Sequence, residues 1–147
     1  MMMNNISSDN LESLFSLEIR PASLSDVAYI ASTYCRTMQS EYKDMHPDTY
    51  NQWSSNRLDN LIANSIVLVA HPPDEPNLIV GYGLFSESSI HFVYVRKPYR
   101  RTHTAKRLVS HWVSNTHQTP PFTITHITNP IRTIKANDRE LFTYIPY

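Results

Sequence analysis

The stretch from Val93 to Val109 constrains the fold of this chain more than any other. An apolar strand pattern leads through a basic turn into a helical pattern that begins at Thr104. Four arginines and two lysines lie within a span of twelve residues, 96–107, and the first turn of the helix carries no acidic side chain. The free amides at a helix start carry partial positive charge, and neighbouring arginines strengthen their attraction for anions. The stretch therefore predicts a phosphate-binding turn.

The length and the charge limit what this turn can serve. A chain of 147 residues fits one domain, which we expect over residues 17–147 after a flexible tail at 1–16. The formal net charge is zero, so the chain lacks the extended basic surface that nucleic acid or anionic lipid usually requires. The local basic cluster favours a small anionic ligand. Nucleic-acid binding, with Tyr99 stacked on a base, is the weaker alternative.

The sequence predicts a cytoplasmic protein without a membrane partner. It has one cysteine, Cys35, which forbids an intramolecular disulfide and suits a reducing compartment. We expect no signal peptide or anchor, because the first ten residues are polar, and no apolar run approaches the roughly 20 residues that span a bilayer. Its histidines form no short ligand pair, so we predict no metal site. The oligomeric state stays open, a homodimer included.

Hydrophobic periodicity predicts alternating strands and helices. Ser23 and Asp26 stand three apart as a capping pair before an amphipathic helix over residues 24–43. The other predicted elements are strands at 17–20, 66–70, 78–85, 89–95, 122–128 and within 141–147, helices from Pro47 and at 104–116, and a short helical piece at 131–136. Strand 66–70 reads as buried on both faces. Both glycines lie in strand 78–85, where the backbone must pass close to another segment. Such mixed elements predict a central sheet with helices packed on its faces, an α/β class.

This order of elements resembles the GNAT superfamily of acyl-CoA-dependent N-acetyltransferases over roughly residues 17–129. The family motif is a strand followed by Arg or Gln, two residues, Gly, one residue, and Gly or Ala at a helix start. Here Tyr94-Val95 ends the strand, Arg100 takes the first motif position and Ala105 the last. The resemblance implies a mostly antiparallel sheet that splays between its fourth and fifth strands, and acetyl-CoA as acyl donor.

His103 stands where the family has its glycine. Glycine is favoured where the backbone takes a positive φ or approaches a ligand closely. Histidine enters the left-handed region more readily than a β-branched residue does, and its ring can donate a hydrogen bond to phosphate.

The resemblance also assigns residues to the cofactor. The amides between Arg101 and Ala105 would hold the pyrophosphate, with Arg100 and Arg101 near the phosphates. Val93, Tyr94 and Val95 would pair with the pantetheine arm, and Asn129 would contact the cofactor after the fifth strand. The full set of predicted cofactor residues is Val93, Tyr94, Val95, Arg100, Arg101, Thr102, His103, Thr104, Ala105 and Asn129.

Acyl transfer to an amine requires a general base, because the attacking amine must be uncharged. Relatives often use a Glu near the start of the fourth strand, where this chain has Ser89. Glu87 and His91 would share its side of an extended strand by period two, so either is a candidate base. The alternative is that Glu87 caps a hairpin turn and His91 is a hydrogen-bonded strand residue.

The remaining site predictions concern the leaving group and the acceptor. The family's usual acid is a Tyr on the helix after Asn129, which this chain lacks, so Tyr144 or Tyr147 folding back over the cleft are the candidates; both also suit plain packing. Tyr34, Tyr42, Tyr50 and Trp53 either line the acceptor cleft or belong to the core. The sequence thus predicts an N-acetyltransferase for a small amine or a protein amino group. The alternative is a GNAT-fold protein without turnover that binds a macromolecular partner.

Overall fold

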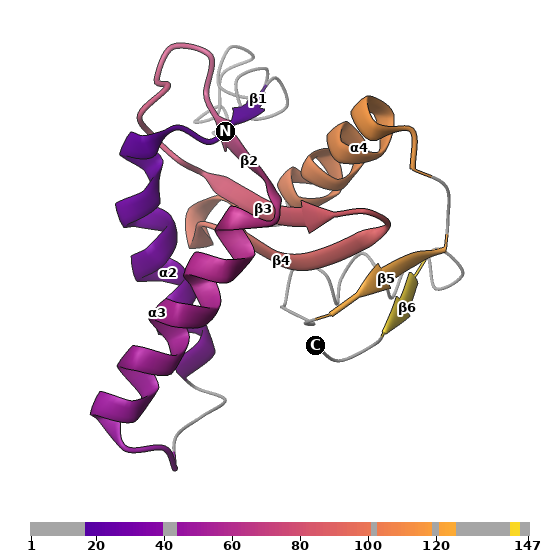
Figure 1. The fold of residues 1–147 in the computed structure, drawn as a ribbon. Helices are drawn as coiled ribbons and strands as arrows, with labels where there is room; N and C mark the ends of the chain where they lie inside the picture. The colour runs from indigo at the N-terminus through magenta and orange to yellow at the C-terminus, as the bar shows by residue number, and fades with distance from the viewer. Residues whose placement is uncertain (1–16, 40–43, 101–102, 119–120, 126–141, 145–147) are drawn as a thin grey trace, which may run out of the picture.

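The computed structural model describes residues 17–39, 44–100, 103–118, 121–125 and 142–144, and shows one six-stranded mixed sheet (Figure 1). Its strands lie in sequence order: β1 (Glu18–Pro21), β2 (Ile66–His71), β3 (Gly81–Ser86), β4 (Ser89–Val95), β5 (Phe122–Ile124) and β6 (Phe142–Tyr144). The first four strands pair antiparallel, and β5 pairs parallel with both β4 and β6. The predicted α/β class and the mixed sheet are confirmed.

Helices cover both faces of this sheet (Figure 1). One face carries α2 (Val27–Gln39), which follows the short 3₁₀ turn η2 (Leu24–Asp26), and α3 (Pro47–Ala63). The other face carries α4 (Thr104–Thr116), which is preceded by η3 (Lys97–Tyr99). The buried side chains form two clusters that match these layers, with Leu108 and Trp112 of α4 in one and Ile30 and Tyr34 of α2 in the other. Alternating strand residues supply the sheet side of each cluster.

The predicted capping pair is present and also ties the first strand to the first helix. The Ser23 amide donates to Asp26 Oδ2 (2.7 Å), and the Asp26 amide donates to the Ser23 carbonyl (3.0 Å). Arg20 of β1 donates to both carboxylate oxygens of Asp26, at 2.7 and 3.1 Å, and to the Pro76 carbonyl (3.0 Å). Asp26 is buried, so these bonds replace its lost hydration.

Element boundaries differ from the sequence prediction in places that have local causes. The strand predicted from Leu78 begins at Gly81, because the Leu78 amide donates to the Glu75 carbonyl (3.1 Å) in a turn. Ile66, predicted to be buried on both sides, is 41% exposed at the start of β2. Pro47 starts α3 as predicted, and the His46 ring accepts from the Asp48 amide (3.2 Å). The helical piece predicted at 131–136 lies outside the described residues.

No helix among the described residues is long and apolar enough to cross a bilayer.

Candidate functional site: the α4 turn and the strand bulge beside it

The turn before α4 has the backbone conformation that a glycine would favour. His103 takes φ 63° and ψ 15°, in the left-handed region, immediately before Thr104 enters the helix. Among the described residues only Ser88, His103 and His117 combine a side chain with a positive φ. His103 thus takes a positive φ, one of the two conditions for which glycine is favoured, and histidine does so at some strain.

A left-handed residue followed by helical residues turns successive amides toward one concave side. The first amides of an α-helix are not used by its internal hydrogen bonds, and the first turn of α4 carries no acidic residue. The Arg107 amide donates to the His103 carbonyl (2.9 Å), so the regular hydrogen bonding of α4 begins with the carbonyl of its N-cap residue. Backbone amides in this arrangement can donate hydrogen bonds to a phosphate group.

Gly81 holds the start of α4 close to the sheet. A Cβ at Gly81 would lie 2.9 Å from the Tyr94 carbonyl oxygen and 3.1 Å from Thr104 Cγ2. Any side chain at Gly81 would therefore press against the β4 backbone and against the first turn of α4. The close approach that the glycines predicted in this strand is thus present, and it sets the α4 turn against the end of β4.

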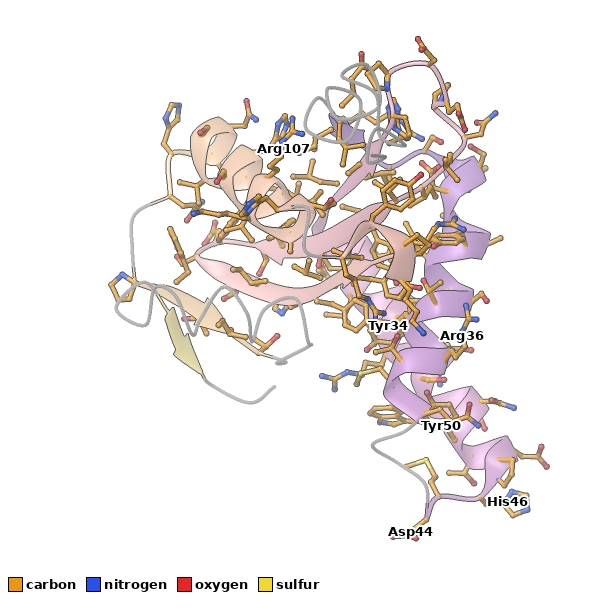
Figure 2. The ribbon with its side chains drawn as sticks, turned by 180° about the vertical axis from the view of Figure 1, so that it is seen from behind. Tyr34, Arg36, Asp44, His46, Tyr50 and Arg107 are labelled. Atoms are coloured by element: carbon orange, nitrogen blue, oxygen red, sulfur yellow. The ribbon has the colours of Figure 1, made fainter. Side chains whose placement is uncertain are left out.

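The cations of the basic cluster divide into two groups. Lys97, Arg100 and Lys106 are exposed near the α4 turn, and Arg100 Nε donates to the Val95 carbonyl (3.0 Å) across the end of β4. Arg107, labelled in Figure 2, instead donates from Nη2 to the Leu17 carbonyl (2.9 Å) before β1.

Arg96 is also turned away from the α4 turn. Its Nε donates to the Ile79 carbonyl (2.9 Å), and its guanidinium lies 4.9 Å from the centre of the Tyr29 ring. Arg101 and Thr102, two of the predicted cofactor residues, lie outside the described residues.

The described pairing of β4 with β5 lies at the start of β4. Ser89 and Ile90 pair with Thr123 and Ile124, and the Thr125 amide donates to the Ile90 carbonyl (3.0 Å). The chain that follows Thr125 lies outside the described residues, so the splay between the fourth and fifth strands stays a prediction.

The Tyr94 side chain, which was predicted to line the cofactor arm, is half-buried in an aromatic group. Its ring stacks on Tyr82, with 5.5 Å between centroids, and meets Tyr29 edge-on at 6.3 Å. Val93 and Val95 turn their buried side chains into the cluster beneath α4. An extended ligand at this end of β4 would therefore be contacted mainly by the backbone.

His91 is the extra residue of a β-bulge. Leu84 pairs with Phe92 and Phe85 pairs with Ile90, so the register shifts by one residue at His91. Leu84 and Phe92 lie in the cluster beneath α2 and α3, whereas Phe85 and Ile90 lie in the cluster beneath α4. Bulges redirect a side chain locally and are common beside active sites. The strict period of two that the sequence predicted for this strand is therefore broken at the candidate base.

The His91 ring is held at both nitrogens by hydroxyl groups. Ser86 Oγ lies 2.7 Å from Nε2, and Thr125 Oγ1 lies 2.8 Å from Nδ1. Partial burial lowers the pKa of His91, and the charge of Arg57 on α3 lowers it further. The ring is therefore neutral at physiological pH, as a base requires.

Glu87 does not share a strand with His91. Glu87 and Ser88 form the exposed two-residue turn between β3 and β4, and Ser88 takes φ 56° there. The prediction that Glu87 lies on the same extended strand face as His91 is wrong, because the chain reverses at this point. The alternative agrees with the structure: Glu87 lies in a hairpin turn, and His91 is a hydrogen-bonded residue of β4. Tyr144 is the last residue of β6, paired in register with Ile124 of β5. Asn129 and Tyr147 lie outside the described residues.

Two of the aromatic residues predicted on the first two helices belong to the core. Tyr34 and Tyr50 are 1% and 3% exposed, and they lie along the α2–α3 pair, whose tip carries Asp44 and His46 (Figure 2). Tyr34 packs against Phe92 at 4.9 Å between centroids, next to the bulge in β4.

Arg57 of α3 joins this group. Its Nε donates to the Tyr34 hydroxyl (3.2 Å), and its guanidinium lies 5.4 Å from the centre of the partly buried Trp53 ring. Tyr42, the fourth predicted aromatic residue, lies outside the described residues. Within the described part of the chain, no three His, Cys, Asp or Glu side chains come together as metal ligands.

Solved structures with similar folds include proteins described as acetyltransferases. A GCN5-related N-acetyltransferase from Rhodopseudomonas palustris has a TM-score of 0.56 at 15% identity, covering 82% of this chain and 79% of that one. The apo form of YjaB from Escherichia coli has a TM-score of 0.57 at 14% identity, covering 85% of this chain and 80% of that one. A possible acetyltransferase from Clostridium difficile 630 gives 0.54 at 19% identity, with 89% and 92% covered. Scans against protein-family models and curated proteins found no match.

At these identities the similarity establishes architecture, so the chain has the fold of the GCN5-related, or GNAT, N-acetyltransferases. The substrate and the reaction are inferred below.

Proposed function

We propose that this protein is an N-acetyltransferase that uses acetyl-CoA as acyl donor and a small-molecule or protein amine as acceptor. The observation that carries the proposal is the left-handed His103 at the start of α4, in a chain with the GNAT fold. His103 has the left-handed backbone conformation that glycine adopts easily, at the position where the motif has glycine. A single cysteine, Cys35, suits the cytoplasmic location that we propose with it.

The backbone at the α4 turn suits a pyrophosphate. A left-handed residue before a helix directs successive amides to one side, and the first turn of α4 carries no acidic side chain to repel phosphate. Arg100 lies between β4 and α4. Arg101, Thr102 and Asn129 join the proposed cofactor residues on the resemblance alone. The pantetheine arm would run back along the backbone of Val95, Tyr94 and Val93.

An arm that follows β4 backward from Val95 reaches His91 after about 13 Å, four residues of extended strand. When bound, acetyl-CoA supplies an activated acyl group. The chain supplies a neutral imidazole at the same place, so we assign His91 the role of general base. Glu87 is not assigned this role because it lies in the exposed turn. Tyr144 stays a candidate proton donor on the sequence argument alone.

Isothermal titration calorimetry tests the donor. We expect acetyl-CoA to bind with measurable heat and to raise the unfolding temperature. Acetyl-pantetheine, which lacks the pyrophosphate, should bind at least tenfold more weakly, because the α4 turn then has no anion to hold. Absence of both heat and thermal stabilisation at millimolar acetyl-CoA would reject the proposal.

The second candidate is a protein of the same fold that binds a macromolecular partner without turnover. It is favoured by Ser89, which stands where relatives often carry an acid. Thiol release from acetyl-CoA in the presence of amines separates the two: the enzyme releases coenzyme A in step with acetylated amine. Binding of acetyl-CoA without any release would favour the second candidate.

A further inference from the structure

The hydroxyl groups around His91 suit a ring that carries its proton on Nδ1. Thr125 Oγ1 lies 3.5 Å from the Ile90 carbonyl and 2.8 Å from His91 Nδ1. When its hydroxyl hydrogen is directed to that carbonyl, its oxygen is left to accept from His91 Nδ1–H. In this tautomer Nε2 is unprotonated and accepts the hydroxyl hydrogen of Ser86 at 2.7 Å. A hydroxyl thus lies against the basic lone pair of the ring.

Ser86 is the last residue of β3 and is half-buried, directly before the exposed turn at 87–88. His91 lies at the register shift of β4, close enough to Arg57 of α3 for that charge to lower its pKa. The Nε2 lone pair is covered by Ser86, so a proton that comes from outside the ring meets the serine oxygen first.

From this geometry we propose that Ser86 relays a proton to His91 and that Thr125 is a positioning residue that fixes the His91 tautomer. The inference rests on the proposed function, because it assigns the proton path of the acetyl transfer. It also differs from direct use of His91, since Ser86 Oγ is the atom that touches the acceptor amine.

The relay conserves protons and charge. As the amine forms its bond to the acyl carbon, its surplus proton moves to Ser86 Oγ, and the proton already on Oγ moves to His91 Nε2. Ser86 ends as a neutral hydroxyl and His91 as an imidazolium, whose Nδ1–H stays on Thr125. The carbon–sulfur bond breaks, and the sulfur leaves as a thiolate that takes up the proton from the imidazolium. The products are the amide and the free thiol, without an oxidant or a further reactant.

Nitrogen-15 NMR of the full chain, labelled at histidine, tests the arrangement without any ligand. We expect the wild-type His91 to carry its proton on Nδ1 at neutral pH. Ser86→Ala removes the donor that stabilises the neutral ring, so the pKa of His91 should rise. Thr125→Val removes the acceptor for Nδ1–H, so the tautomer preference should be lost. A wild-type ring that carries its proton on Nε2 would overturn the relay.

Kinetics with methylamine as the acceptor, followed as thiol release from acetyl-CoA, test the function of Ser86. Ser86→Ala should lower kcat at least tenfold and flatten the pH profile, with the Kd of acetyl-CoA unchanged. Ser86→Thr keeps a hydroxyl and should restore most of the rate, and Ser110→Ala, at an exposed position on α4, should leave it unchanged.

An unchanged kcat in Ser86→Ala, or an acetyl group found on Ser86 by mass spectrometry, would contradict the relay. Failure of the proposed function is recognised separately, because acetyl-CoA would then give no calorimetric heat while the NMR result could still hold.

Discussion

Replacing His103 by glycine should stabilise the protein. A side chain in the left-handed region costs roughly 1 to 2 kcal/mol, and His103 sits there with φ 63°. Glycine removes that strain but gains about 0.5 to 1 kcal/mol of backbone freedom in the unfolded chain. The net expectation for His103→Gly is a gain in the free energy of unfolding of about 0 to 1.5 kcal/mol, centred on about 0.75 kcal/mol. In a chain of this length that raises Tm by roughly 2 °C.

The other end of α4 offers a matched control. His117 caps the helix with φ 55°, also left-handed and exposed, so His117→Gly should give a gain of similar size. His103→Val should instead lose more than about 1 kcal/mol, since β-branched residues tolerate this region least. Urea unfolding measures all three variants. A lower stability in His103→Gly, or equal stability in His103→Gly and His103→Val, would refute the conformational argument.

Three further predictions concern the Arg20–Asp26 ion pair, the contact at Gly81 and the first turn of α4. The ion pair with Arg20 and the Ser23 bonds lower the pKa of Asp26 from 3.8 to about 2, so Asp26→Asn should cost about 2 kcal/mol at pH 7. Because the folded pKa is the lower one, this difference should shrink as the pH falls from 3.8 toward 2 in urea titrations; a constant difference would contradict the ion-pair origin. Gly81→Ala should lose about 1 to 3 kcal/mol by forcing β4 and α4 apart, measured as a lower Tm, and an unchanged Tm would show that the contact yields freely. Ala105→Glu should weaken acetyl-CoA binding in calorimetry by at least tenfold, whereas Ser110→Glu, farther along the same helix, should leave it unchanged.

Periodicity and capping chemistry predicted most of the fold because they act locally. The strand at residues 89–95 and the helix at 104–116 match the structure, and Ser23 with Asp26 marks the start of the first helix. The motif also located the turn at His103, since a fixed spacing after a strand determines where the backbone must turn. The positive φ at His103 is one of the two reasons for which glycine is favoured at such a position.

The site around His91 depends on contacts that local patterns do not encode. The bulge arises from the pairing of β4 with β3, so a period of two could not reveal that His91 and Phe92 leave the alternation. The hydroxyl partners are 5 and 34 residues away in the chain: Ser86 ends β3, and Thr125 directly follows β5. The alternative that placed Glu87 in a hairpin turn carried the useful signal, because a two-residue turn at Glu87-Ser88 removes Glu87 from the strand and leaves Ser86 opposite Ser89.

The most direct test of the pyrophosphate site is a titration of the nitrogen-15-labelled chain with acetyl-CoA, followed through backbone amide shifts. Amides that donate to phosphate should shift strongly, so the account predicts the largest changes at Thr104, Ala105 and Lys106, in the first turn of α4. Acetyl-pantetheine should leave these three amides nearly unchanged. Saturating acetyl-CoA that shifts other amides but not these would contradict the central claim.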